Sequence, residues 1–446
     1  MKKKTFYLVL VLMIFLLSLF NCSGPGTTEK KGSIRILWAR WTPADMLETL
    51  CLDFTRETGI SVELVQEPWG SWQTLFFNEM SRKGRTFDMV VGDSQWLGRG
   101  AVQGHYTELT KWVQSHGLDR SMTRSSIEGY AEFPKGSGHL WAVPLEGDAM
   151  GFSFRKDLFE DPEEKKAFHA KYGYELRIPK TWQSVKDIAQ FFYRPKKDLY
   201  GLLSWVEPHY DGLTMGVQTL IWAFGGDLGD RRTYRVRDII NSREAIEALK
   251  FYKSLNRFNN PQWQDHYLDT HKNSNTPMMK GRVAMAMGYF SINSELLDPG
   301  KTPYAGKIGF FAAPSGPGGR ACTLGGQGVS IISYSRKKDL SLRFLEWFIR
   351  EDVQKKWASL GGLTCNKNVL NSDEFLNASP INKPFKESIE MAKDFWAVPE
   401  YADLLRVSQT HWFEYVVIGS RSPESAMDRI ATEWEQIFES GGYYKE

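Results

Sequence analysis

Hydrophobic and polar positions along the first hundred residues alternate between two periods. Residues 33–38 alternate every second position like a strand, and 43–58 carry apolar residues at helical spacing. A second strand is expected at 60–65, a second helix at 72–82 and a third strand at 86–91. This strand–helix–strand order predicts a parallel sheet covered by helices, which is an α/β fold.

The pattern continues into the rest of the chain with less regularity. Two extended segments, 140–144 and 150–154, are expected on either side of a turn at 145–148. Strands are predicted at 200–203 and 281–287, and helices are predicted to begin after Thr181 and after Asn241-Ser242, which are suitable N-caps. The region from about 337 to 438 has the pattern of a mostly helical segment.

The N-terminus has the pattern of an export signal. Three lysines precede an apolar run from 6 to 20, and Cys22 follows at once. The Cys with small residues behind it resembles a bacterial lipobox, although Phe20 and Asn21 are unusual before such a Cys. Residues 1–22 are therefore expected to be a signal peptide with a lipidated Cys22, and 23–32 a flexible tether. Ordinary signal cleavage and an uncleaved anchor are the alternatives.

Composition narrows the class of protein. The ~415 residues behind the tether exceed what one hydrophobic core usually covers, so two lobes are expected. The 56 basic and 53 acidic residues nearly balance, which argues against a nucleic-acid partner. The other cysteines, Cys51, Cys322 and Cys365, show no metal-binding spacing, so neither a metal nor a cofactor is predicted. Cys322 and Cys365 are candidates for a disulfide in an oxidising compartment.

Five motifs, the first of them in two parts, carry a family resemblance. They are LWAVPLEGD (140–148) with FRKDLF (154–159), PKTWQS (179–184), GRVAM (281–285), the segment 308–326 and SRSPESAM (420–427). Together they resemble family 1 extracellular solute-binding proteins of ABC importers, of the sugar-type, maltose-binding-protein-like branch. Each motif is weak alone, and their order behind a lipobox makes the resemblance specific.

The resemblance implies a two-lobe, periplasmic-binding-protein-like (type II) clamshell that closes on a ligand by bending at a hinge. Its N-terminal lobe would hold 33–146 plus 283–331, and its C-terminal lobe 147–282 plus 332–446. The implied function is that of a monomeric, lipid-anchored protein outside the cytoplasm. Such a protein captures a mono- or oligosaccharide and delivers it to ABC permease subunits.

Candidate ligand-binding residues follow from strand ends, from the 16 tryptophans and from the resemblance. Aromatic faces stack on sugar rings, and carboxylates accept hydrogen bonds from neighbouring hydroxyls. In an extended segment Glu146 and Asp148 are not both expected to bind, and Trp96 is expected to belong to the core. The candidates are Trp41, Trp69, Asp93, Gln95, Asp148, Tyr210, Tyr289, Gly326 and Trp412.

Other functions stay open at this point. A glycoside hydrolase would also use carboxylates such as Asp93 and Asp148 in a tryptophan-rich cleft. However, the sequence has no nucleophile elbow, HExxH motif or P-loop, so we expect no enzymatic activity. A binder with the same fold that senses a polyamine, an organic anion or a peptide is the second alternative.

Overall fold

The structure is a computed structural model, and it describes residues 32–209, 212–266 and 274–444. The predicted signal peptide, Cys22 and almost all of the tether lie outside the described residues, as does Tyr210. Within the described part, no helix has both the length and the apolar character needed to cross a membrane.

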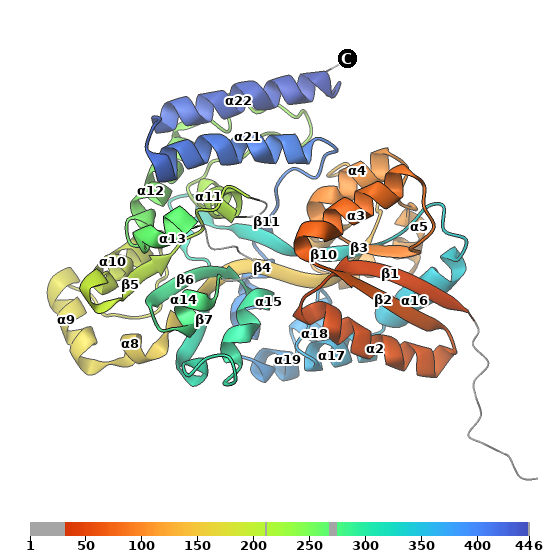
Figure 1. Cartoon of the computed structure of the whole chain (residues 1–446), viewed down its shortest axis with the longest axis horizontal. Coiled ribbons are helices and arrows are strands. Elements are labelled where there is room, and N and C mark those ends of the chain that lie inside the picture. Colours follow the sequence, from red (N-terminus) through yellow and green to blue (C-terminus); the bar gives the residue numbers. More distant parts are fainter. Residues whose placement is uncertain (1–31, 210–211, 267–273, 445–446) are drawn as a thin grey trace, which may run out of the picture.

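The first hundred residues form the sheet that the hydrophobic pattern predicts. Strand β1 (Ser33–Ala39) pairs in parallel with β2 (Ser61–Glu67) on one side and with β3 (Met89–Asp93) on the other. Helices α2 (Thr42–Thr58) and α3 (Trp69–Ser81) connect these strands. Because all three strands are parallel, their carboxyl ends meet at one edge of the sheet (Figure 1).

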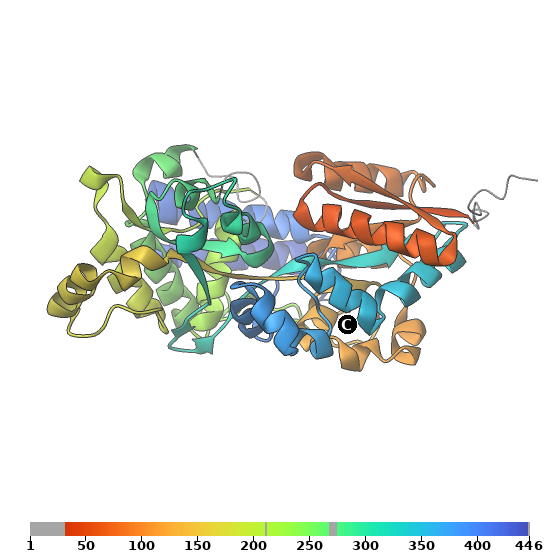
Figure 2. The same ribbon diagram turned by 90° about the horizontal axis from the view of Figure 1, so that it is seen from below.

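One long strand connects two halves of the molecule. Residues 143–149 of β4 (Val143–Arg155) pair with β10 (Cys322–Ile331), which itself pairs with β3. Residues 150–155 pair instead with β6 (Val283–Tyr289) and β7 (Ile308–Ala312). Figures 1 and 2 show β4 running through the middle, with β1–β3 on one side and β5–β7 on the other. The fold is therefore the expected two-lobe α/β architecture.

The expected turn at 145–148 is wrong, because β4 is continuous through those residues. All thirteen of its residues are buried, and 146–148 pair with Gln327, Gly326 and Gly325 of β10. Pairing with the neighbouring strand, together with a hydrogen bond from the Gly147 N–H to the Leu363 carbonyl at 2.7 Å, overrides the local preference of Glu146-Gly147-Asp148 for a turn. A register shift beside Gln327 is the only irregularity between these two strands.

The second half of the sheet is covered by helices that begin where their caps predict. Thr181 and Ser184 form a capping box at the start of α10 (Trp182–Phe192), and Ser242 caps α12 (Arg243–Asn256). Strand β5 (Tyr200–Leu203) pairs with β6, and α11 (Gly212–Ala223) packs against α12.

The helices after β10 divide between the two halves. Helices α16 (Lys338–Phe348) and α17 (Glu351–Ser359) pack against β1 and α2, and Arg350 forms an ion pair with Glu57 at 3.1 Å. Helices α21 (Tyr401–Phe413) and α22 (Pro423–Ser440) pack on the other half, against α11 and α12 (Figure 1).

These contacts bear on the predicted lobe boundaries. Strands β6 and β7 pair with the second half of β4, and α16 and α17 contact elements of the first lobe. We propose that 283–312 belongs to the second lobe and 338–359 to the first. The boundaries inferred from the resemblance placed these segments the other way round, because sequence motifs do not record which half a segment packs against.

Short elements complete the chain. The helices are α4 (Leu97–Val102), α5 (Thr110–Ser115), α6 (Leu118–Ser121), α7 (Arg124–Tyr130), α8 (Lys156–Glu160), α9 (Pro162–Tyr172), α13 (Pro261–His266), α14 (Thr276–Met279), α15 (Phe290–Asn293), α18 (Lys367–Leu370), α19 (Asp373–Ala378) and α20 (Asn382–Ile389). The strands are β8 (Ser315–Gly316), β9 (Gly319–Arg320) and β11 (Ala392–Lys393). The three cysteines of the described chain, Cys51, Cys322 and Cys365, are buried and free, so the candidate disulfide is not formed.

Candidate functional site

A pocket lies where β1–β3, β4, β6 and β10 come together. About 370 Å³ between its walls is free of protein atoms, and part of this space is open to solvent. Its described lining contains two carboxylates and no Lys, Arg or His. The lining residues are Trp41, Trp69, Asp93, Ser94, Gln95, Asp148, Tyr289, Ile292, Leu324, Gly325, Gly326 and Gln327.

Two tryptophans form the aromatic wall on the first lobe. Trp41 follows β1 directly and Trp69 begins α3 after β2, so both stand at the carboxyl edge of the parallel sheet. Their ring centroids are 5.4 Å apart with the planes at 80°, an edge-to-face contact that fixes both rings. The indole N–H of Trp41 has no hydrogen-bond partner among the described residues. A ligand oxygen in the pocket is therefore a suitable acceptor for it.

Polar side chains follow β3 at the same edge. Asp93 ends the strand, and Ser94 and Gln95 open the short helical turn behind it; all three are buried. The Ser94 hydroxyl donates to the Asp93 carboxylate at 3.2 Å. On the adjacent strand, the Gln327 side chain accepts from the indole N–H of Trp38 at 3.0 Å, which fixes its orientation. Open α/β sheets place their ligands at such strand ends.

Asp148 connects the pocket to the second lobe. Its Oδ1 accepts the backbone N–H of Phe290 at 3.0 Å and of Ser291 at 3.3 Å, and its Oδ2 accepts the Ser291 hydroxyl. These donors belong to the first turn of α15. Burial raises the pKa of Asp148 to about 7, although its hydrogen bonds, chiefly from Ser291 and Ala149, favour the charged form.

Glu146 lies two residues away and does not line the pocket. Its side chain is fully buried. Burial, followed by the nearby charge of Asp148, raises the pKa of Glu146 well above its ordinary value, and a backbone hydrogen bond from Leu363 acts in the opposite direction. Of the two acids only Asp148 faces the ligand space.

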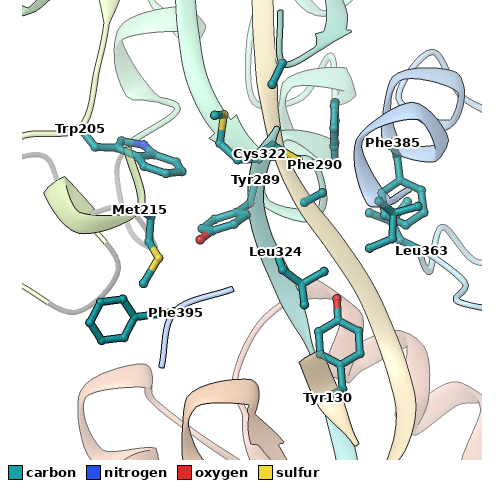
Figure 3. Packing of buried hydrophobic residues seen from close by; sticks show 14 of the residues in the cluster. Tyr130, Trp205, Met215, Tyr289, Phe290, Cys322, Leu324, Leu363, Phe385 and Phe395 are labelled. Atoms are coloured by element: carbon teal, nitrogen blue, oxygen red, sulfur yellow. The ribbon is translucent and has the colours of Figure 1, made fainter. Parts of the chain in front are cut away.

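Tyr289 forms the aromatic wall on the second lobe. Its ring packs on Trp205 with a centroid distance of 5.2 Å and an interplanar angle of 34°. Figure 3 shows Tyr289 on the side of the strands that carries Trp205, whereas Phe290 lies on the side of Phe385. Of the two aromatic residues after β6, Tyr289 is therefore the one that reaches the pocket.

The glycines of β10 fit the pocket because larger residues would collide there. A Cβ on Gly325 would lie 2.7 Å from the Tyr289 ring and 3.1 Å from the Cβ of Asp148. Gly326 has φ of +80°, a conformation that L-residues other than Asn and Asp rarely adopt. The glycines thus let the strand approach Tyr289 and Asp148 closely, which shapes the floor of the pocket.

One predicted site residue of the described chain, Trp412, is not brought to the pocket. Trp412 is fully buried between α21 and α22, where its indole N–H points at the sulfur of Met427 at 3.3 Å. Trp412 therefore does not line this pocket, and its role as a ligand contact stays a prediction. Tyr210 lies outside the described residues. Trp96 is a core residue, as expected, and packs on Trp72 with centroids 4.3 Å apart.

Sequence reasoning missed Ile292 and Leu324, which line the pocket, and Asp394, which lies beside it. Burial raises the pKa of Asp394 to about 6, while a hydrogen bond from Ser94 and the charge of Asp93 act in opposite directions. Apolar residues such as Ile292 carry no chemical signal in the sequence. Asp394 could not be predicted from the sequence, because it lies close to Ser94 only in the folded chain.

The segment that contains Asp394 contacts the first lobe at two further points. Tyr401 is hydrogen-bonded to the side-chain amide of Gln73 on α3. Gly98 on α4 lies so close to the backbone of Ala397 that a Cβ would stand 2.9 Å from the Ala397 carbonyl carbon. The residues 394–401 therefore rest against the first lobe beside the pocket.

The fold and this pocket define a class of two-lobe binding proteins, and a family comparison agrees. Residues 39–355 match the profile of the bacterial extracellular solute-binding proteins, and the chain belongs to this family. The chain is therefore the substrate-binding component of an ABC import system, which acts outside the cytoplasm as a binder.

Individual relatives are distant. A probable ABC transporter-binding protein of Deinococcus radiodurans is 26% identical over 344 residues, which cover 73% of this chain and 75% of the relative. The solved structure of maltose-bound MalE3 from T. maritima matches with a TM-score of 0.74 and 21% identity, covering 91% of this chain and all of that one. A solute-binding protein of Agrobacterium radiobacter K84 in complex with ribitol has a TM-score of 0.75 and 19% identity, with coverage of 92% and 100%. At these identities the structures establish the fold.

Proposed function

We propose that this protein captures an uncharged sugar or sugar alcohol between its two lobes and delivers it to an ABC permease. One observation carries the choice of substrate: Trp41, Trp69 and Tyr289 share a pocket with Asp93 and Asp148, and no basic side chain is found in its described lining. Aromatic faces stack on the C–H faces of a sugar, and carboxylates accept from its hydroxyls. Relatives of the same fold have been solved with maltose and with ribitol.

The charge of the pocket disfavours an organic anion. An anionic ligand would be buried beside Asp93 and Asp148 without a cation from the described lining to pair with, which costs several kcal/mol in such surroundings.

A polyamine is the stronger competitor, because ammonium groups pair with carboxylates. However, Asp148 already accepts three hydrogen bonds from α15, and burial holds its pKa at about 7. Part of the charge that an ammonium group would need is therefore absent at neutral pH. A neutral sugar hydroxyl loses less binding free energy when Asp148 is protonated, because the hydroxyl can also accept a hydrogen bond from the protonated acid.

The experiment is titration calorimetry with maltose, mannitol, ribitol, spermidine and citrate at low and at high salt. A sugar or sugar alcohol should bind with nearly the same affinity at both concentrations, because no ligand charge is screened. Spermidine binding that weakens severalfold in high salt would replace the sugar assignment with a cation-binding one. Binding of citrate alone would contradict the charge argument.

Lobe closure and anchoring belong to the same proposal. Saturating ligand should lower the radius of gyration in X-ray scattering while the helix content stays constant, and an unchanged scattering curve would argue against hinge closure. We further propose that Cys22 is lipidated and tethers a monomeric protein to the membrane. A palmitate analogue should label the wild type and not Cys22→Ser, and equal labelling would refute the lipid anchor.

A further inference from the structure

The ligand-facing carboxylate of Asp148 is held by a contact that crosses between two distant parts of the chain. Asp148 lies on β4, and its hydrogen-bond donors lie 142 and 143 residues further along, at Phe290 and Ser291. Phe290 and Ser291 begin α15 directly behind Tyr289, which is itself a wall of the pocket. The contact therefore connects two ligand-facing side chains from different elements.

The donors to Asp148 in this contact are of two kinds. The two backbone N–H groups are fixed by the helical turn, whereas the Ser291 hydroxyl is the one side-chain donor among them. Ser291 is buried, with 6% of its surface exposed, so water does not readily replace its hydroxyl. Removing that hydroxyl would leave Oδ2 of Asp148 without a protein donor that the structure shows.

We infer that Ser291 is a positioning residue of the solute site: its hydroxyl orients the Asp148 carboxylate toward the ligand and keeps that carboxylate ionised. This inference rests on the proposed function, because it assumes that ligand hydroxyls donate to Asp148. A donor to a carboxylate stabilises the charged form, so Ser291 holds down a pKa that burial raises. Ser291 thereby sets the lower pH limit of tight binding.

The sign of the pH effect follows from the same contact. Ligand hydroxyls bind the ionised carboxylate better than the neutral acid, so binding lowers the pKa of Asp148. Affinity is then highest above the pKa of Asp148 in the ligand-free protein, about 7, and decreases as pH falls through this value. Other titratable groups near Asp148 come from β4, α7, β3, β6 and β10, and they are Glu146, Tyr130, Asp93, Tyr289 and Cys322.

Burial raises the pKa of Tyr130 and of the Cys322 thiol, which stay protonated near neutral pH, and it also raises the pKa of Glu146. Asp93 is a second ionisable carboxyl group in the lining of the same pocket. The variant Asp148→Asn separates the contribution of Asp148 from that of Asp93, because any pH dependence of the affinity that remains in this variant comes from groups other than Asp148.

The test measures maltose and ribitol affinity, using whichever sugar binds the wild type, from acidic to alkaline pH on both sides of neutrality. In Ser291→Ala the pH at which half of the affinity is lost should move upward by about one unit. Ser291→Thr restores a hydroxyl and should return this midpoint toward the wild-type value. Ser294→Ala is the matched control, because its hydroxyl donates to the Ser291 carbonyl at 2.6 Å and not to Asp148.

Three outcomes show whether the role of Ser291 or the proposed function itself is wrong. A midpoint that is the same in Ser291→Ala and the wild type would overturn the positioning role, even if the overall affinity fell. Equal upward shifts in Ser291→Ala and Ser294→Ala would also overturn it, because they would reflect a general loosening of α15. If neither sugar binds the wild type, the proposed function fails instead. Circular dichroism and thermal unfolding verify that each variant is folded.

Discussion

Gly98→Ala tests whether the contact between α4 and the segment 394–401 forms on closure. In this structure an alanine Cβ at position 98 would lie 2.9 Å from the carbonyl carbon of Ala397 and closer still to its oxygen. Ordinary van der Waals contact begins near 3.4 Å, and the carbonyl oxygen limits the approach, so the backbone of Ala397 would have to move by well over ~0.5 Å. A backbone carbonyl cannot rotate away as a side chain can, so the variant favours separation of the two segments.

The magnitude follows from the cost of overpacking, which is typically about 1–3 kcal/mol. If this cost falls on the closed form alone, affinity decreases by roughly 5- to 140-fold. In the open form a Cβ at position 98 would still lie 2.7 Å from Cε2 of the Phe133 ring in the same lobe, so part of the cost remains, offset by up to about 1 kcal/mol from replacing a helical Gly by Ala. The contact with Ala397 adds its cost to the closed form alone, so the affinity should fall by more than the stability of the ligand-free protein explains.

The assay pairs calorimetry with thermal unfolding of the ligand-free protein. Gly306→Ala is the control, because a Cβ there meets no atom within 4 Å, so both quantities should stay at their wild-type values. Wild-type affinity in Gly98→Ala would show that α4 and Ala397 do not approach each other in the bound form. An equal loss of stability in the ligand-free and the ligand-saturated variant, measured by thermal unfolding, would show that the contact with Ala397 exists without ligand, which would refute the closure argument.

Three further predictions address the pocket and the core. Asp93→Asn should weaken sugar binding by roughly ten- to a hundred-fold, since a buried charged acceptor contributes about 1.5–3 kcal/mol. Calorimetry measures this affinity, and a wild-type value would show that Asp93 does not bind the ligand. Trp412→Ala should lower the free energy of unfolding by about 3–5 kcal/mol, while the folded fraction binds sugar with wild-type affinity. Weakened binding without destabilisation would show that Trp412 contacts the ligand. In denaturant without reductant, Cys322 and Cys365 should both react with a thiol reagent, and their protection would indicate a disulfide.

The sequence by itself determined the local elements and the edge at which the site forms. The period of the hydrophobic pattern is set by backbone geometry, so β1, β2, β3 and their helices followed from it directly. Parallel strands end at a common edge, and this rule brings Trp41, Trp69 and Asp93 together from the strand pattern alone. Asp148 and Tyr289 followed from the family resemblance, because their motifs keep a fixed order along the chain.

Only the tertiary structure decided what depends on partners distant in the sequence. Residues 145–148 have the composition of a turn, yet pairing with β10 makes them part of a strand. Trp412 lies on a helix whose pattern does not reveal which face meets the ligand, and α22 covers it. The contact of Asp148 with Ser291 joins residues 143 positions apart. Such pairings depend on how the whole chain packs, and no local window of the sequence contains both partners.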